Sequence, residues 1–347
     1  MPLDALMTRT PPSMPLSSHP VPCLSVVIPT FRRIASLKRC LDAVLAQNID
    51  PQRYEIIVVD DGHEEMVREL IAALGAVTPN GPRLRYLRPF KGRGPAVARN
   101  CGWRAARGAI VAFTDDDTVP EPGWLGEGHA ALRRHGEWSA LCGRITVPRL
   151  QAGRPTDHEL MTIGLEAAQF ATANAFVRRT ALARVGGFDE RFSRAWREDS
   201  DLHFRLMNEV GPVGVCRLAI VSHPVRPERW GVCLRQQRNA FFDALLYKKH
   251  PQLYRNRIRP IPPYNYYLIV GLTMAVPSLL WAGSPAAAAS AGVLLIAFWL
   301  HFALRRLWHT RLSVTHVVEM LVTSAIIPFL SVYWRLRGAI RFRVLFW

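Results

Sequence analysis

Two absences narrow the class of protein to which this sequence belongs. Acidic residues are scarce beside basic ones: 27 Asp and Glu stand against 44 Lys and Arg, so the 347 residues carry a formal net charge of +17. Cys-x-x-Cys pairs are missing, and the six cysteines show no metal-ligand spacing. Scattered cysteines of this kind are typical of reduced, buried side chains, which favours a cytosolic compartment over a disulfide-stapled secreted fold.

Charged residues are also absent from one long stretch. No Asp, Glu, Lys or Arg occurs between Arg259 and Arg305. Since one membrane span needs roughly 20 residues, we expect two spans, over residues 264–282 and 286–303, joined by a Gly-Ser-Pro turn. Basic residues flank both ends, and the positive-inside bias then places both ends in the cytoplasm. The basic excess therefore indicates a membrane partner, and no basic-aromatic stripe indicates nucleic acid.

Composition divides the chain into five parts. The first is a Pro/Ser-rich tail without an apolar run, which we expect to be disordered and not a signal peptide. An α/β domain, a basic juxtamembrane linker, the two membrane helices and a third apolar segment follow. We expect this last segment, which contains Pro328, to be re-entrant or an interfacial amphipathic element. The bounds are 1–22, 23–235, 236–262, 263–304 and 305–347.

Short β-branched runs alternate with helical patterns in the first part of the α/β domain. Strands are predicted at residues 24–30, 54–62, 84–88 and 109–113, with helices between them. Such alternation implies a mostly parallel sheet covered on both faces. Ligands bind outside the carboxyl ends of such strands. The polar residues at the carboxyl ends of the first, second and fourth strands should therefore converge on one site.

The aspartates at 115–117 follow the last of these strands directly. Asp115 and Asp117 alternate on an extended segment, so both side chains can point to one side. Carboxylate oxygens suit Mg²⁺ or Mn²⁺, which take further ligands from substrate phosphates and water. The alternative is a solvated acidic turn in which one aspartate caps a helix.

Two other loops carry groups suited to a nucleotide. Asp60 and Asp61 end a strand, where a carboxylate can accept from a base imide or a ribose hydroxyl; a plain turn is the alternative. Gly94 precedes a helix and lies among Lys91, Arg93 and Arg99. Glycines permit close backbone approach, and basic side chains beside a helix start favour phosphate. The alternative is a basic surface loop.

Glu198 and Asp199 open a predicted helix. A carboxylate there can act as a general base toward a sugar hydroxyl, or it can only stabilise the helix dipole. His223 follows a predicted strand as a lone histidine. For this residue we favour a structural or supporting role over metal ligation.

Six segments, taken in order, resemble the family 2 glycosyltransferases, in particular membrane-anchored bacterial members, over roughly residues 24–225. They are SVVIPTFRR, IIVVDDG, GPAVARNCGWRAARG, FTDDDTVPEPGWL, NAFVRRTALARVGGFDERF and REDSDLHFRL. The resemblance implies a GT-A fold, with a Rossmann-like nucleotide-binding sheet joined to an acceptor half. It also implies inverting transfer from a UDP- or GDP-sugar with Mn²⁺ or Mg²⁺.

The resemblance assigns roles to residues of this chain. Asp115 and Asp117 would be the ends of a DxD motif, with Asp117 as the direct metal ligand. Asp199, beside Glu198, would be the catalytic base. The nucleotide would contact Pro29, Thr30, Phe31, Asp60, Asp61, Arg99, Asn100 and Asp116. Asn174 and Trp196 would lie on the acceptor side.

The sequence therefore predicts a membrane-anchored enzyme that glycosylates a hydroxyl of a surface glycan or glycolipid. Three alternatives stay open. In the first alternative, the acceptor is a polyprenyl phosphate. The second is a nucleotidyltransferase with a similar fold, and the third is a non-catalytic, membrane-tethered nucleotide-binding protein.

Overall fold

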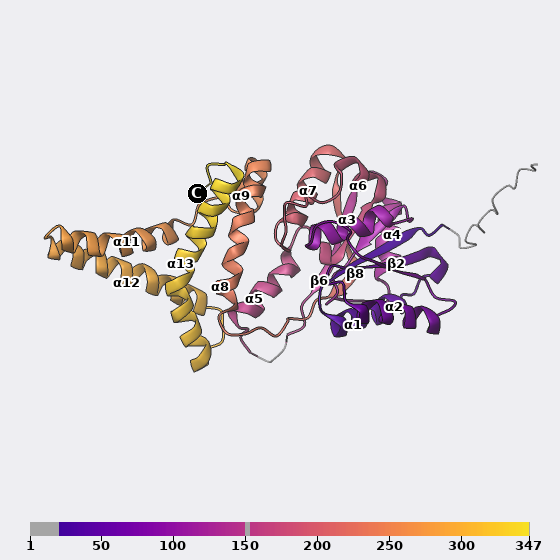
Figure 1. Ribbon diagram of the computed structural model, residues 1–347, viewed down its shortest axis with the longest axis horizontal. Helices are drawn as coiled ribbons and strands as arrows, with labels where there is room; N and C mark the ends of the chain where they lie inside the picture. The colour runs from indigo at the N-terminus through magenta and orange to yellow at the C-terminus, as the bar shows by residue number, and fades with distance from the viewer. Residues whose placement is uncertain (1–20, 150–152, 347) are drawn as a thin grey trace, which may run out of the picture.

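A mixed eight-stranded sheet forms the centre of the computed structural model, which describes residues 21–149 and 153–346 (Figure 1). The expected tail lies almost wholly outside the described residues. The strand order is β3-β2-β1-β4-β7-β6-β8-β5. The strands are β1 Leu24–Thr30, β2 Tyr54–Asp60, β3 Arg83–Leu87, β4 Ile110–Phe113, β5 Val119–Pro120, β6 Ala140–Thr146, β7 Ala175–Arg178 and β8 Val213–Ser222.

The first four strands are parallel, as the alternation predicted. Thr30 of β1 lies opposite Asp60 of β2, and Val27 lies opposite Phe113 of β4. The carboxyl ends of these strands therefore meet at one edge of the sheet. The second half is mixed, because β7 runs antiparallel to both β4 and β6. Strand β8 is parallel to β6, and its end pairs antiparallel with β5.

Helices cover both faces of the sheet with separate apolar cores. Helices α1 Ile34–Leu45, α2 Glu65–Val77 and α4 Trp124–Arg134 pack on one face, where Val26 and Ile28 point. Helices α3 Pro95–Ala105, α6 Arg179–Val185 and α7 Glu198–Glu209 pack on the other, where Val27 points. This layering confirms the predicted α/β class, and it directs the starts of α3 and α7 toward the same edge.

Helix α3 lies unusually close to the sheet. A Cβ added at Gly102 would lie 2.3 Å from a methyl carbon of Val27, so only glycine permits this packing. The helix begins at Pro95, whose missing N–H is no loss at a first helical position. Close packing of α3 fixes Arg99, one turn further along, over the carboxyl ends of the strands.

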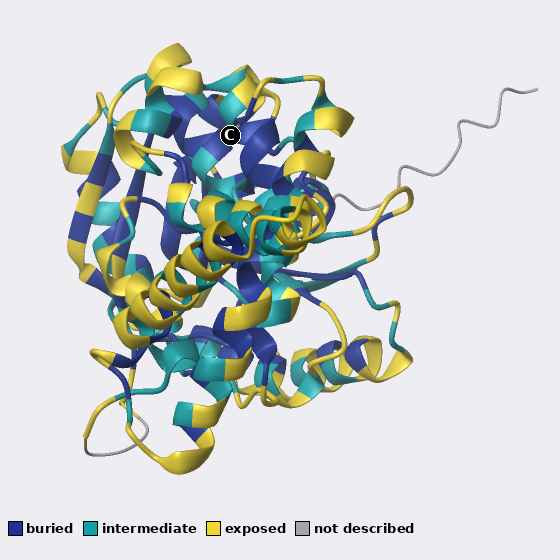
Figure 2. Cartoon of the chain, turned by 90° about the vertical axis from the view of Figure 1, so that its left-hand side faces the viewer, coloured by how far each residue is buried: buried dark blue, intermediate teal, exposed yellow. Residues whose placement is uncertain are grey.

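The remaining helices follow or flank the α/β unit. They are α5 Asp157–Ile163, α8 Val232–Gln236, α9 Ala240–Lys249, α10 Pro251–Arg257, α11 Tyr264–Trp281, α12 Pro285–Leu307 and α13 Val314–Phe342. Figure 1 shows α11 and α12 side by side, projecting away from the sheet, with α13 crossing their base steeply. Figure 2 shows that most residues along this hairpin are exposed.

Two of the described helices are long and apolar enough to cross a membrane by length and composition, α12 and α13. The sequence predicted spans in the segments that form α11 and α12. Helix α11 has 18 residues and begins with the polar run Tyr-Asn-Tyr-Tyr, which lowers its mean hydropathy. Helix α13 continues unbroken through Pro328. The re-entrant or interfacial placement expected for residues 305–347 therefore stays a prediction.

Candidate active site

A cavity of about 460 Å³ lies at the carboxyl edge of the parallel strands. Eight of the residues predicted to form a site line it: Pro29, Thr30, Phe31, Asp61, Gly94, Arg99, Asp115 and Asp116. Other lining residues had no nucleotide contact assigned from the sequence, among them Arg33, Ser193, Ala195 and Arg226. The predicted convergence of three strand ends is therefore present in the structure.

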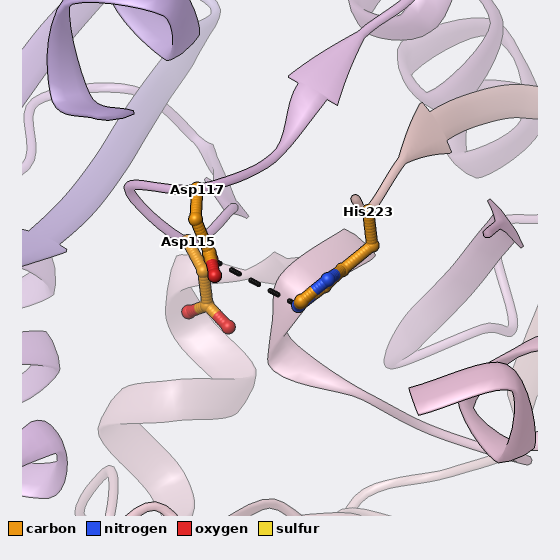
Figure 3. A group of neighbouring side chains, drawn as sticks. All are labelled: Asp115, Asp117 and His223. Atoms are coloured by element: carbon orange, nitrogen blue, oxygen red, sulfur yellow. Dashed lines mark ion pairs between the residues drawn. The ribbon is translucent and has the colours of Figure 1, made fainter. Parts of the chain in front are cut away.

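Asp115, Asp117 and His223 form a compact group beside this cavity (Figure 3). One ligand atom from each lies within 4.8 Å of the others. The register explains the arrangement: Val119 of β5 pairs with Ser222 of β8, so His223 returns next to the aspartates. The Asp117 Oδ1 atom lies 3.9 Å from His223 Nε2 and is buried without a hydrogen-bond partner. An orphaned carboxylate oxygen is what a missing cation would leave, so these residues fit a divalent ion.

The donor set also bears on the choice of ion. Mg²⁺ prefers oxygen ligands alone, whereas imidazole nitrogen suits transition metals. Two carboxylates and one imidazole therefore form a donor set that suits a divalent cation. His223 lies beside the two carboxylates, so it can act as a ligand as well as in the structural or supporting role that the sequence favoured.

Arg226 also contacts this group. Its Nε pairs with the Asp117 Oδ2 atom, and its side chain is 40% exposed. Burial alone would raise the pKa of Asp115, but Arg99, followed by His223, holds that pKa below its usual value. Asp115 is therefore an ionised ligand candidate at neutral pH.

The middle aspartate points elsewhere. Thr30 Oγ1 donates to Asp116 at 2.8 Å, and Arg33 Nη1 donates to its other oxygen at 3.2 Å. Burial raises the pKa of Asp116, while Arg33 opposes that rise. Three adjacent carboxylates are thus separated: two face His223, and the third binds the end of β1.

The side chains of Asp60 and Asp61 also have different partners. Asp60 accepts from Gly62 N at 2.9 Å, from Glu64 N at 2.6 Å and from the Tyr86 hydroxyl at 2.9 Å. It closes the turn into α2 and does not line the cavity. Asp61 lines the cavity, accepts from Gly94 N at 2.9 Å, and keeps Oδ1 buried without a partner. Of the two residues, only Asp61 offers a free acceptor to a nucleotide.

Gly94 is required by its backbone. Its φ is +110°, and a Cβ there would lie 2.8 Å from the carbonyl oxygen of Ser193. The glycine thus lets the loop before α3 approach the loop before α7. Both loops line the cavity.

The acidic pair at the start of α7 reaches the site through an arginine. Arg99 Nη1 donates to Glu198 Oε1 at 3.0 Å, and Nη2 donates to Asp115 Oδ1 at 2.8 Å. Burial, with the neighbouring Asp199, raises the pKa of Glu198 to about 8. Burial also raises the pKa of Asp199, which Arg99 opposes. A carboxylate with a raised pKa is suited to accept a proton near neutral pH.

Two residues that were predicted to lie at the site, Asn100 and Asn174, do not line the cavity. Asn100 is fully buried; its Oδ1 accepts from Phe188 N and Trp103 Nε1, and its Nδ2 donates to Phe188 O. Asn174 is also fully buried, accepting from Trp124 Nε1 and donating to two backbone carbonyls. Neither side chain has a group left for a ligand. The structure therefore gives both asparagines packing roles in place of the predicted nucleotide and acceptor contacts.

Trp196 lies on a second cavity, beyond the loop that borders the first. Its Nε1 donates to Asp243 Oδ1 at 3.1 Å, and Arg197 stacks on its ring at 4.5 Å. The second cavity lies between the α/β unit and the C-terminal helices. The acceptor role predicted for Trp196 thus stays a prediction, with a cavity beside it.

The fold is shared with a solved glycosyltransferase. The mannosyltransferase from Pyrobaculum calidifontis, solved with GDP-Man and Mn²⁺, superposes with a TM-score of 0.55 over 89% of this chain and 87% of its own, at 19% identity. This likeness gives the chain the GT-A fold. The model described as Glycosyl transferase family 2 matches residues 25–188.

Sequence relatives agree with this class. The glycosyltransferase AglE from Haloferax volcanii is 26% identical over 226 residues, or 62% of this chain and 71% of the relative. The pre-mycofactocin glycosyltransferase from Mycobacterium tuberculosis is 31% identical over 267 residues, or 72% of this chain and 52% of the relative. Together, the family model and these relatives support a family 2 glycosyltransferase, and therefore an enzyme.

Proposed function

We propose that this enzyme transfers a sugar from a nucleoside-diphosphate sugar to an acceptor hydroxyl, with inversion, at the cytoplasmic face of a membrane. The acceptor in this proposal is a surface glycan or glycolipid. The observation that carries the proposal is a metal-suited group, formed by Asp115, Asp117 and His223, beside the strand-edge cavity. Arg99 joins Asp115 of this group to Glu198, the neighbour of Asp199 at the start of α7.

The donor half of the proposal is supported by the cavity wall. Asp61 Oδ1 is a free buried acceptor for a base or ribose, and Arg93 and Arg226 bring positive charge for a diphosphate. Asp115, Asp117 and His223 would hold Mn²⁺ or Mg²⁺. Such an ion, when bound, neutralises charge that develops on the leaving diphosphate. The solved mannosyltransferase of the same fold binds GDP-Man and Mn²⁺.

The chemistry needs one displacement. Asp199 takes the proton of the acceptor hydroxyl while its oxygen forms a bond to the anomeric carbon. The bond from that carbon to the diphosphate oxygen breaks, and the nucleoside diphosphate leaves. A single displacement inverts the anomeric centre. Glu198 and Arg99 stay in place and set the charge around Asp199.

A phosphate acceptor, as in the polyprenyl-phosphate alternative, would need no such base. A phosphate monoester is already ionised near neutral pH. The raised pKa of Asp199 therefore favours a hydroxyl nucleophile.

The membrane part of the proposal rests on the hairpin. Helix α12 has 23 residues and a rise of about 34 Å, enough for a hydrocarbon core of about 30 Å. Arg305 and Arg306 end α12, and Arg255 and Arg257 precede α11. Basic flanks at both ends of the hairpin favour cytoplasmic ends. Helix α13, which crosses the base of the hairpin, would then lie along the membrane surface (Figure 1).

The experiment is a thermal-shift screen of the purified full chain with UDP- and GDP-sugars, with and without Mn²⁺. A bound donor raises the unfolding temperature by mass action. We expect one nucleotide-sugar to do so in a Mn²⁺-dependent manner and to be consumed when acceptor lipid extract is added. Absence of any nucleotide-sugar effect would contradict the proposal.

A further inference from the structure

The second cavity has a volume of about 500 Å³ and is bounded by α5, α8, α9 and the three C-terminal helices. We call it the arginine cavity, because Arg259, Arg306 and Arg335 line it. Two carboxylates, Asp157 and Asp243, also line it. Its charged side chains therefore carry a net positive charge.

Arg335, on α13, lies in the wall of this cavity with incomplete hydrogen bonding. The residue is 1% exposed. Its Nε donates to the Tyr267 hydroxyl at 3.3 Å, and its guanidinium stacks on the Phe346 ring at 4.1 Å. Its Nη2 is buried and has no hydrogen-bond partner. Burial of an incompletely bonded guanidinium is costly, so the geometry points to an anionic partner that completes it.

The carboxylates of the wall are already engaged. Asp157 pairs with Arg306 at 2.8 Å, and Asp243 pairs with Arg197 at 2.7 Å. Arg306 also donates to Thr323 and Ser324 at 2.8 and 2.9 Å. Arg259 forms no ion pair with any other residue that the structure describes. Two guanidinium groups, of Arg259 and Arg335, thus lack a carboxylate partner within the cavity.

Apolar side chains complete the cavity on the side of the hairpin. Tyr266 of α11, Phe302 of α12 and Ile327 of α13 line it and pack against one another. On the other side stands Trp196, one residue beyond Ala195, which lines the donor cavity. The arginine cavity therefore adjoins both the membrane-directed helices and the loop that leads to Asp199.

We infer that the arginine cavity binds the phosphate or diphosphate group that joins a lipid to the acceptor sugar. This inference rests on the proposed function. A guanidinium fork matches phosphate oxygens in geometry and charge. The lipid chain would leave along α11 and α12, and the sugar would extend past Trp196 toward Asp199. The acceptor is accordingly a hydroxyl on a phosphate-linked glycolipid.

The test measures binding to the full chain in neutral detergent micelles with three probes: dodecyl phosphate, dodecanol and inorganic phosphate. We expect dodecyl phosphate to raise the unfolding temperature and the other two to have little effect at equal concentration. Equal effects of dodecyl phosphate and dodecanol would overturn the anionic site. An equal effect of inorganic phosphate would overturn the lipid part of the inference.

Variants locate the site. We expect Arg335→Gln and, separately, Arg259→Gln to weaken dodecyl phosphate binding by roughly tenfold, and Arg335→Lys to restore part of it. The matched control is Arg337→Gln, an exposed arginine on the same helix, which should change binding less than twofold. If Arg335→Gln fails to fold, Arg259→Gln decides alone; unchanged binding in the folded variants overturns the inference.

Donor binding separates the two proposals. Each variant should keep the Mn²⁺-dependent thermal shift with the nucleotide-sugar, because the donor cavity contains none of these arginines. If the chain binds the nucleotide-sugar but dodecyl phosphate raises the unfolding temperature no more than dodecanol does, this inference alone is contradicted. If the chain binds no nucleotide-sugar, the proposed function is contradicted.

Discussion

Arg99 donates a buried hydrogen bond to Glu198 at 3.0 Å, although 99 positions separate the two residues in the sequence. The same guanidinium holds Asp115 at 2.8 Å. One cation is thus shared by a carboxylate of the metal-suited group and by the acidic pair at the start of α7. The charge state of either end of the site therefore acts on the other through Arg99.

Replacement of Arg99 by Met should destabilise the fold strongly. Removing one partner of a buried charge group costs about 3–5 kcal/mol, because the other charges stay buried and uncompensated. The free energy of unfolding, from denaturant titration, checks this. The control is Arg104→Met on the same helix, an exposed arginine 3.4 Å from Glu190, where about 0–1 kcal/mol is expected. Similar losses for both variants would contradict the shared-cation account.

Replacement of Asp199 by Asn should separate binding from chemistry. We expect the transfer rate to fall by about 10²- to 10⁴-fold, the contribution of a positioned base, while nucleotide-sugar affinity stays within twofold. Single-turnover kinetics and thermal shift measure the two quantities. If donor binding is lost together with the rate, Asp199 has a structural role and another base must be sought.

Replacement of Arg226 by Ala should strengthen Mn²⁺ binding in the absence of donor. Arg226 pairs with Asp117 and competes with a cation for that carboxylate. We expect severalfold tighter Mn²⁺ binding by calorimetry, together with weaker donor affinity, since the cavity loses a positive charge. The exposed Arg229→Ala serves as the control and should change neither. Weaker Mn²⁺ binding in Arg226→Ala would show that the arginine does not compete.

Ionisation of the buried Glu198 should lower the free energy of unfolding as pH rises. Its pKa of about 8 lies above the ordinary carboxyl value, so the folded state binds more protons than the unfolded state between the two pKa values. Stability is then fully present below the unfolded pKa and is lost as pH rises toward about 8. Glu198→Gln cannot lose that proton and can still accept from Arg99. We expect its unfolding temperature to fall less than that of wild type between pH 5 and 8. Parallel curves would contradict the assignment.

The sequence predicted the parts of the site that follow from local periodicity. Thr30, Asp61 and Asp115 each follow a β-branched run, and parallel pairing of those runs brings them to one edge. His223 and Arg226 depended on the antiparallel pairing of β8 with β5, which no local pattern encodes. The one available signal was the position of His223 directly after a strand, as with the aspartates.

Other residues were misjudged because hydrogen bonds in the core use up their polar atoms. Asn100 and Asn174 were assigned to ligands by resemblance, yet both bond fully within the fold. The path of the C-terminal segment was also only partly predictable. Uncharged length predicted the hairpin of α11 and α12, but the packing of α13 on α9 depends on contacts between distant residues such as Gly338 and Phe241.

The central claim, that Asp115, Asp117 and His223 hold the cation used in nucleotide-sugar binding, is tested most directly by Mn²⁺ titration in the presence of the donor. His223→Ala and Asp117→Ala are compared with wild type, and His129→Ala on α4 is the matched control. We expect both site variants to weaken Mn²⁺ binding by at least roughly tenfold, as loss of even supporting groups does at metal sites, with the control unchanged. Equal Mn²⁺ affinity in wild type and in both site variants would contradict the account.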